Sequence, residues 1–108
     1  MNANYKISDL STEPVYVSFR IENPVLGAED LSAATVEIAV SRATPKAADW
    51  LAATVEPGTW VAPDGETYYV ATTTIDGSLL ARSTHQIYLR VQHNGFTFVQ
   101  RAGSVEVY

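Results

Sequence analysis

The sequence predicts an all-β domain, an immunoglobulin-like β-sandwich of about seven strands. Apolar and polar residues alternate with a period of two in several segments, which is typical of strands with one buried face. Turn residues separate these segments at intervals of about 8–12 residues, as expected of a sandwich or a small barrel. The chain of 108 residues suffices for one compact domain, and it contains no cysteine, so disulfides cannot stabilise it.

The first clear strand begins at Val15 and ends near Ile21, with valine and phenylalanine on one face and polar residues on the other. A second strand, Val36–Val40, repeats the alternation. The residues before position 14 are polar and weakly patterned. We therefore expect an N-terminal arm at residues 1–13 and a single sandwich domain at residues 14–108.

Residues 44–54 form the ambiguous element of the chain. Thr44-Pro45 resembles a helix N-cap followed by proline at the first helical position, and the alanines that follow favour a short helix. The competing interpretation is a loop with a helical turn that leads Trp50 into the next strand. We prefer the loop, because the surrounding segments are all β, and expect one short helical turn near residues 45–52.

The second half of the chain carries the strongest strand signals. The stretch Thr67–Ile75 is rich in β-branched and aromatic residues and contains no breaker. The tight-turn dipeptide Asp76-Gly77 follows it. Gln86–Gln92 then alternates again, with aliphatic residues on one face. These segments predict two further strands of the sandwich.

Asn94-Gly95 is the clearest turn signal, since both residues accept the positive φ of a type I′ hairpin. A two-residue turn here places His93 opposite Phe96 and, two residues on, Val91 opposite Phe98. Beyond the returning strand, Ala102-Gly103 is a candidate β-bulge.

The segments VEIAVSRATPKAADWLAATV, GETYYVATTTIDG and HQIYLRVQHNGFTFVQRAGSVEVY together resemble small immunoglobulin-like proteins encoded among the head and head–tail genes of tailed phages of actinobacteria. The resemblance covers about the last two-thirds of the chain. The matching residues are Pro45, Asp49, Trp50, Tyr68, Tyr69, Gly77, Tyr88, Arg90, Val91, Val105 and Tyr108. The hairpin tip differs, because His93-Asn94-Gly95 stands where the family often has a Pro-Glu-rich turn.

This resemblance implies a non-catalytic structural protein of the virion, attached at the head–tail neck or on the capsid surface. The partners it implies are other virion proteins (capsid, portal or neck components) in a symmetric assembly. It implies a location in the virion after synthesis in the host cytoplasm.

Charge and hydropathy limit the partners further. The net charge is −5, and the seven basic residues are scattered along the chain, whereas nucleic-acid binding relies on clustered lysine and arginine. The apolar runs are too short to span a bilayer. We expect neither nucleic acid nor a membrane as a partner.

The residue pattern predicts no catalytic, cofactor or metal site. His85 and His93 lie about 25 Å apart at strand rise, and we expect both to be partly exposed strand-end residues. Asp64-Gly65-Glu66 is too short for a calcium loop, and a turn already explains it. Ser83-Thr84-His85 offers no nucleophile–base pair, because adjacent strand residues point to opposite faces. We therefore expect no enzyme activity and no cofactor.

The aromatic residues are the candidates for an interaction surface. Trp50 is expected to pack in the core between the sheets. Outward-facing aromatic side chains are enriched in interfaces, although half-exposed strand tyrosines are also common without a partner. Tyr68 and Tyr69 are adjacent, so one points inward and the other outward. The residues assigned to the surface are Trp60, Tyr69, Tyr88, Tyr16 and Tyr108.

An alternative function uses part of the same surface. In an immunoglobulin-like adhesion or carbohydrate-binding module, Trp60, Tyr69 and the loop acids would form a platform for a sugar. A strict monomer with affinity for a glycan would favour this alternative over a virion protein.

Overall fold

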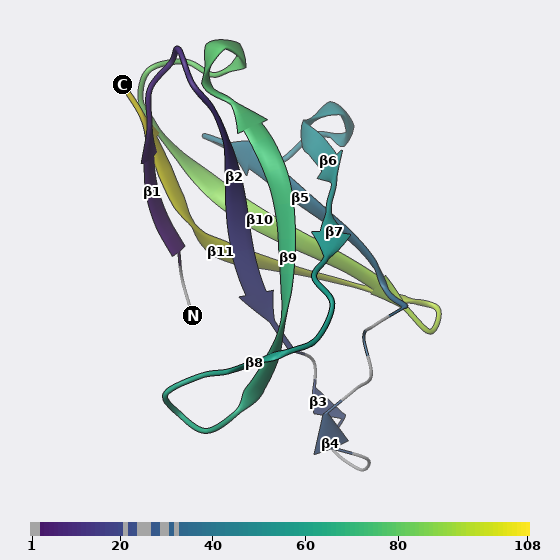
Figure 1. Cartoon of the computed structure of the whole chain (residues 1–108). Helices are drawn as coiled ribbons and strands as arrows, with labels where there is room; N and C mark the ends of the chain where they lie inside the picture. Colours follow the sequence, from purple (N-terminus) through teal and green to yellow (C-terminus); the bar gives the residue numbers. More distant parts are fainter. Residues whose placement is uncertain (1–2, 21, 24–26, 29–30, 32) are drawn as a thin grey trace.

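A computed structural model describes residues 3–20, 22–23, 27–28, 31 and 33–108. Its strands form two packed sheets (Figure 1). The five-stranded sheet has the order β1 (Ala3–Ile7), β11 (Phe96–Val107), β10 (Thr84–His93), β5 (Thr35–Ser41) and β6 (Trp50–Ala52). The second sheet has the order β2 (Thr12–Phe19), β9 (Thr67–Asp76) and β7 (Thr54–Val55), and β8 (Trp60–Val61) also pairs with β9. A separate short hairpin joins β3 (Glu22–Asn23) and β4 (Gly27–Ala28).

This strand order confirms the predicted immunoglobulin-like β-sandwich. The chain passes between the two sheets several times: β5 and β6 lie in the five-stranded sheet, β7 to β9 in the second sheet, and β10 and β11 in the five-stranded sheet again. Between β6 and β7 the change of sheet takes place at Ala53. The neighbours β11, β10 and β5 correspond to the G, F and C strands of the immunoglobulin arrangement, and β2, β9 and β7 correspond to B, E and D.

The core lies between the two sheets and follows the predicted alternation. The buried side chains of β2 and β10 are every second residue, as the period-two pattern requires. In β5 the same alternation holds for Val36, Ile38 and Val40, and Ala39 is buried in addition. The fully buried members of this set are Val15, Val17, Ile38, Ile87, Leu89 and Val91. Burying one such side chain contributes about 1.5–3 kcal/mol, so this layer supplies the main favourable term of folding.

The N-terminus differs from the predicted arm. Ala3–Ile7 forms β1, which pairs in parallel with Gly103–Val107 of β11. Ile7 is only 2 % exposed and belongs to the core cluster. The Tyr5 hydroxyl accepts from the backbone N–H of Tyr16 and donates to its carbonyl oxygen, both at 2.9 Å. A strand this short has too few alternating positions to be recognised from sequence, and its partner lies at the other end of the chain.

The ambiguous segment resolves as a loop with one turn of 3₁₀ helix, η1 (Ala47–Asp49), which confirms the short helical turn predicted near residues 45–52. The turn begins after Lys46, whose backbone N–H donates to Oδ2 of Asp49 at 2.7 Å. A second 3₁₀ turn, η2 (Gly77–Leu79), follows β9.

The hairpin between β10 and β11 has the predicted turn and register. Asn94 and Gly95 have φ values of 47° and 82°, as a type I′ turn requires. His93 pairs with Phe96, and Val91 pairs with Phe98. The register shifts beside Ile87 and Tyr88, opposite the predicted bulge at 102–103.

Candidate interaction surfaces

The five predicted surface residues do not form one surface. Tyr16 is 47 % exposed on β2, and Tyr108 is 60 % exposed at the C-terminus. Tyr88 is half-buried on the outer face of the five-stranded sheet. Trp60 is 37 % exposed on β8. Tyr69 packs against the core beside Phe19, with ring centres 6.0 Å apart.

Trp60 therefore pairs with Tyr68, and its predicted association with Tyr69 is wrong. Trp60 lies directly opposite Tyr68 in the β8–β9 ladder, and their ring centres are 5.9 Å apart. The alternation of β9 contains the explanation, because Tyr69 shares its face with the buried residues Ala71 and Ile75. The alternation along β9 was thus the feature of the sequence that identifies Tyr69, and not Tyr68, as the tyrosine that faces the core.

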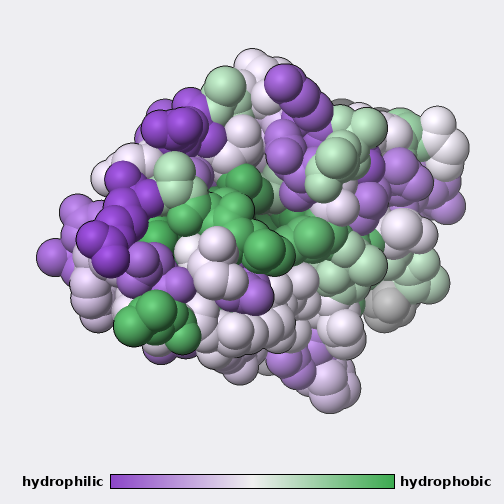
Figure 2. All heavy atoms as spheres, turned by 90° about the horizontal axis from the view of Figure 1, so that it is seen from above, coloured by the Kyte–Doolittle hydropathy of each residue, from purple (hydrophilic) through white to green (hydrophobic). Residues whose placement is uncertain are grey.

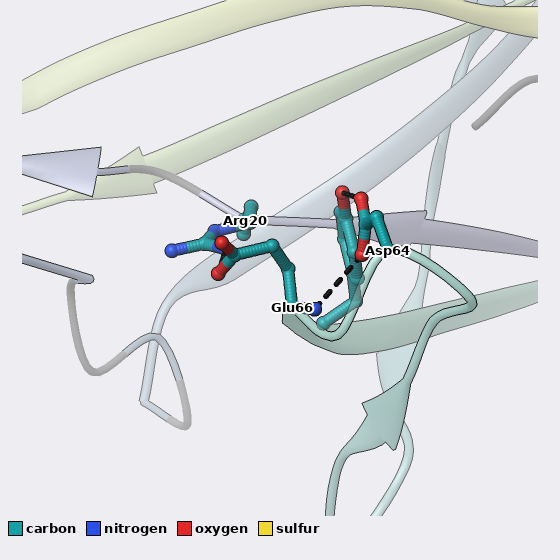
Figure 3. Close-up of polar contacts among 4 residues, drawn as sticks. Arg20, Asp64 and Glu66 are labelled. Carbon is teal, nitrogen blue, oxygen red and sulfur yellow. Dashed lines mark hydrogen bonds and ion pairs between the residues drawn. The ribbon is translucent and has the colours of Figure 1, made fainter.

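Polar contacts of Asp64 and Glu66 fix the loop between β8 and β9 (Figure 3). Asp64 accepts the backbone N–H of Glu66 at 2.8 Å and the hydroxyl of Tyr68 at 3.1 Å. Arg20 forms an ion pair with Glu66, and its guanidinium carbon lies 5.9 Å from the centre of the Tyr68 ring. Desolvation and the hydrogen bond to Asp64 raise the pKa of Tyr68. These contacts hold the hairpin, which carries Trp60, in one shape.

The outer face of the five-stranded sheet carries an arginine clamped between an acid and an aromatic ring. Nε and Nη2 of Arg90 donate to Oε1 of Glu37 at 3.0 and 2.8 Å. The guanidinium carbon of Arg90 is 4.4 Å from the centre of a Trp50 ring. Trp50 and Tyr88 flank Ala39 from the two neighbouring strands, and Ala39 is fully buried.

The expected core position of Trp50 is thus wrong. The residue lies on β6, at the edge of the sheet, and covers the outer face. Trp50 lies opposite Ala39 and shares its outward face, whereas Ile38, the residue before Ala39, faces the core. Sequence alternation alone does not reveal this, because β6 has only three residues.

The β10–β11 hairpin carries exposed apolar side chains on both faces: Phe96 and Phe98 share the inner face with Val91, and Val99 lies opposite Arg90 on the outer face. Phe96, Phe98 and Val99 are 42 %, 38 % and 52 % exposed. His93 packs edge-to-face on Phe96, with ring centres 6.0 Å apart. The tip of the hairpin extends past the second sheet, so none of the described strands of that sheet lies opposite its inner face there (Figure 1). Phe96 and Phe98 were not among the surface residues predicted from the sequence, although they come directly after the turn.

The opposite end of the sandwich carries an apolar hollow of about 180 Å³. Figure 2 shows this end from above, with hydrophobic side chains gathered at its centre. The hollow lies between the ends of β5, β6 and β9 and the two 3₁₀ turns. It is lined by Val40, Ala48, Asp49, Leu51, Ile75, Asp76, Leu79 and Leu80. Leu79, at its rim, is 82 % exposed.

His85 departs from the predicted exposed position. It is 4 % exposed, and its Nε2 lies 2.8 Å from the carbonyl oxygen of Ala81. The burial follows from its place opposite Val105, where β1 also covers β11. His93 is half-buried at the other end of β10. Among the residues the structure describes, no three histidine or acidic side chains gather as potential metal ligands.

Comparisons with protein-family models, with curated proteins and with solved structures returned no match for this chain. In the described part of the chain, no helix is both long enough and apolar enough to cross a membrane.

Proposed function

We propose that this chain is a non-catalytic structural protein of a tailed-phage particle, an immunoglobulin-like domain attached at the head–tail neck or on the capsid surface. The phage setting is supported by the sequence resemblance of the segments after Val36. The observation that carries a binding role is the exposure of large apolar side chains on two protruding hairpins, β8–β9 and β10–β11.

The energetics of these hairpins favour protein contacts. Trp60 and Val61 are 37 % and 63 % exposed on the first hairpin, and Phe96 and Phe98 are similarly open on the second. Aromatic residues that are exposed on a free protein are often buried at the centre of its interface with a partner, where they supply much of the binding energy. The sandwich holds both hairpins on rigid strands, so little conformational entropy is lost on docking.

The carbohydrate-binding alternative has weaker support. It relied on Trp60 and Tyr69 as a platform, but Tyr69 packs inward against Phe19. The remaining neighbour of Trp60 is Tyr68, whose ring is inclined by 45° to it, so the two do not offer one flat stacking surface.

The test is the protein composition of purified particles of a phage that carries the gene, measured by mass spectrometry. The proposal expects the chain in a fixed copy number per particle. Trp60→Ala should reduce its incorporation while the melting temperature stays nearly unchanged. Leu10→Ala is the matched control, because Leu10 is 91 % exposed on the β1–β2 turn, away from both hairpins. Absence of the wild-type chain from the particles refutes the proposal.

A further inference from the structure

Part of β11 has an open edge. On one side, β10 pairs with β11 from Phe96 to Glu106. On the other side, β1 pairs only with Gly103–Val107. Among the described strands, none covers the outer side of residues 96–102, as Figure 1 shows for the part of β11 nearest the hairpin tip. An uncovered edge exposes a row of backbone donors and acceptors that another strand can bind.

The hairpin geometry defines which backbone groups are available. In a two-residue type I′ hairpin, the residues that flank the turn, here His93 and Phe96, form a hydrogen-bonded pair. Hydrogen-bonded and free residues then alternate along an antiparallel strand. The N–H and C=O groups of Thr97, Val99 and Arg101 are therefore directed to the open edge.

The first five residues of this edge lack the side chains that usually block a second strand. Residues 96–100 contain no charge and no proline. Phe96, Phe98 and Val99 are all more than one-third exposed. Proteins usually protect an edge of this kind with charges, proline or a covering segment.

The edge of β2 shows that protection. The Tyr5 hydroxyl occupies both the N–H and the C=O of Tyr16, so these groups face away from β9. By the two-residue period, Pro14 lies on the same side and has no N–H to offer. The outer strands β6 and β8 have only three and two residues. Residues 96–102 of β11, in contrast, are neither short nor blocked by a side chain or a described strand.

We propose that the open edge of β11 pairs with the same edge of a second copy, antiparallel about a two-fold axis at Val99. The two Val99 residues then lie opposite each other, and Thr97 lies opposite Arg101 of the other copy. The two Arg101 residues are offset by four residues, or about 14 Å along the strands, so no like charges face each other. Because the contact is isologous, it uses both edges and closes at a dimer.

A second copy fits this edge better than an unrelated peptide, because each copy already provides an extended strand that β10 holds in place and that carries no charge from residue 96 to residue 100. The dimer joins two five-stranded sheets into one continuous sheet. This inference goes beyond the proposed function and does not depend on a phage setting, since it concerns the isolated chain.

The first test is light scattering coupled to size-exclusion chromatography on the purified chain. The wild type should pass with rising concentration from 11.8 kDa to twice this mass. Val99→Lys places two ammonium groups face to face and should remain a monomer throughout. Val61→Lys is the matched control, because Val61 is also exposed on a strand but lies on β8, and it should dimerise as the wild type does. Melting curves check that both variants are folded.

The second test reports the register. The chain has no cysteine, so a single introduced thiol can cross-link only to another copy. Val99→Cys should form a disulfide dimer on mild oxidation, and Val61→Cys should not. A wild type that stays monomeric, a Val99→Lys variant that still dimerises, or equal cross-linking at both positions overturns the inference. A monomer that adds an extended peptide to this edge also overturns it.

Discussion

Ile7→Ala tests whether β1 belongs to the core. Ile7 is 2 % exposed and packs in the hydrophobic cluster from a strand that pairs with β11. The substitution removes three carbon atoms, each worth about 0.8 kcal/mol on burial. With the cavity left behind, the free energy of unfolding should fall by about 3 kcal/mol. That is a large part of the stability of about 5–15 kcal/mol that is typical of a domain.

The assay is equilibrium unfolding in urea, followed by tryptophan fluorescence. Lys6→Ala is the control in the same strand, because the Lys6 side chain is 76 % exposed and its ammonium lies 3.8 Å from Glu106. Such a surface pair is worth less than about 1 kcal/mol, so this variant should unfold almost as the wild type does. In a thermal scan, Ile7→Ala should lower the melting temperature by roughly 10–20 °C. If Ile7→Ala lowers the free energy of unfolding as little as Lys6→Ala does, residues 3–7 do not contribute to the core and the reasoning fails.

Two further predictions concern the polar contacts. Arg90→Ala should lower the free energy of unfolding by about 1–2 kcal/mol, because it removes the hydrogen bonds to Glu37 and the contact with Trp50. Arg90→Lys should restore less than half of this loss, since lysine lacks the planar guanidinium. Full restoration by Arg90→Lys in urea unfolding would contradict a role for the guanidinium plane against Trp50. The pKa of Tyr68 is raised in the folded chain, so the protonated phenol favours folding below pH about 10, and this contribution is lost as the pH rises through the folded-state pKa. Asp64→Asn should bring that pKa closer to the ordinary tyrosine value in a phenolate absorbance titration, with Tyr68→Phe to assign the signal, and an unchanged titration would exclude Asp64 as a cause.

The sequence by itself determined the fold class and most strand faces. Alternation of apolar and polar residues places Val15, Ile38 and Leu89 in the core, because a strand of sufficient length exposes every second side chain to the same side. Asn94-Gly95 set the hairpin register, since the type I′ turn leaves only one pairing of the flanking residues.

Only the tertiary structure decided the remaining positions. Ile7 is buried because β1 finds its partner about one hundred residues further along the chain, and no local pattern encodes that pairing. Trp50 lies outside because its strand is at a sheet edge and too short for its face to be read. The exposure of Phe96 and Phe98 depends on where the opposing sheet ends. Periodicity fixes the side chains relative to their own strand, whereas burial depends on which distant segments cover that strand.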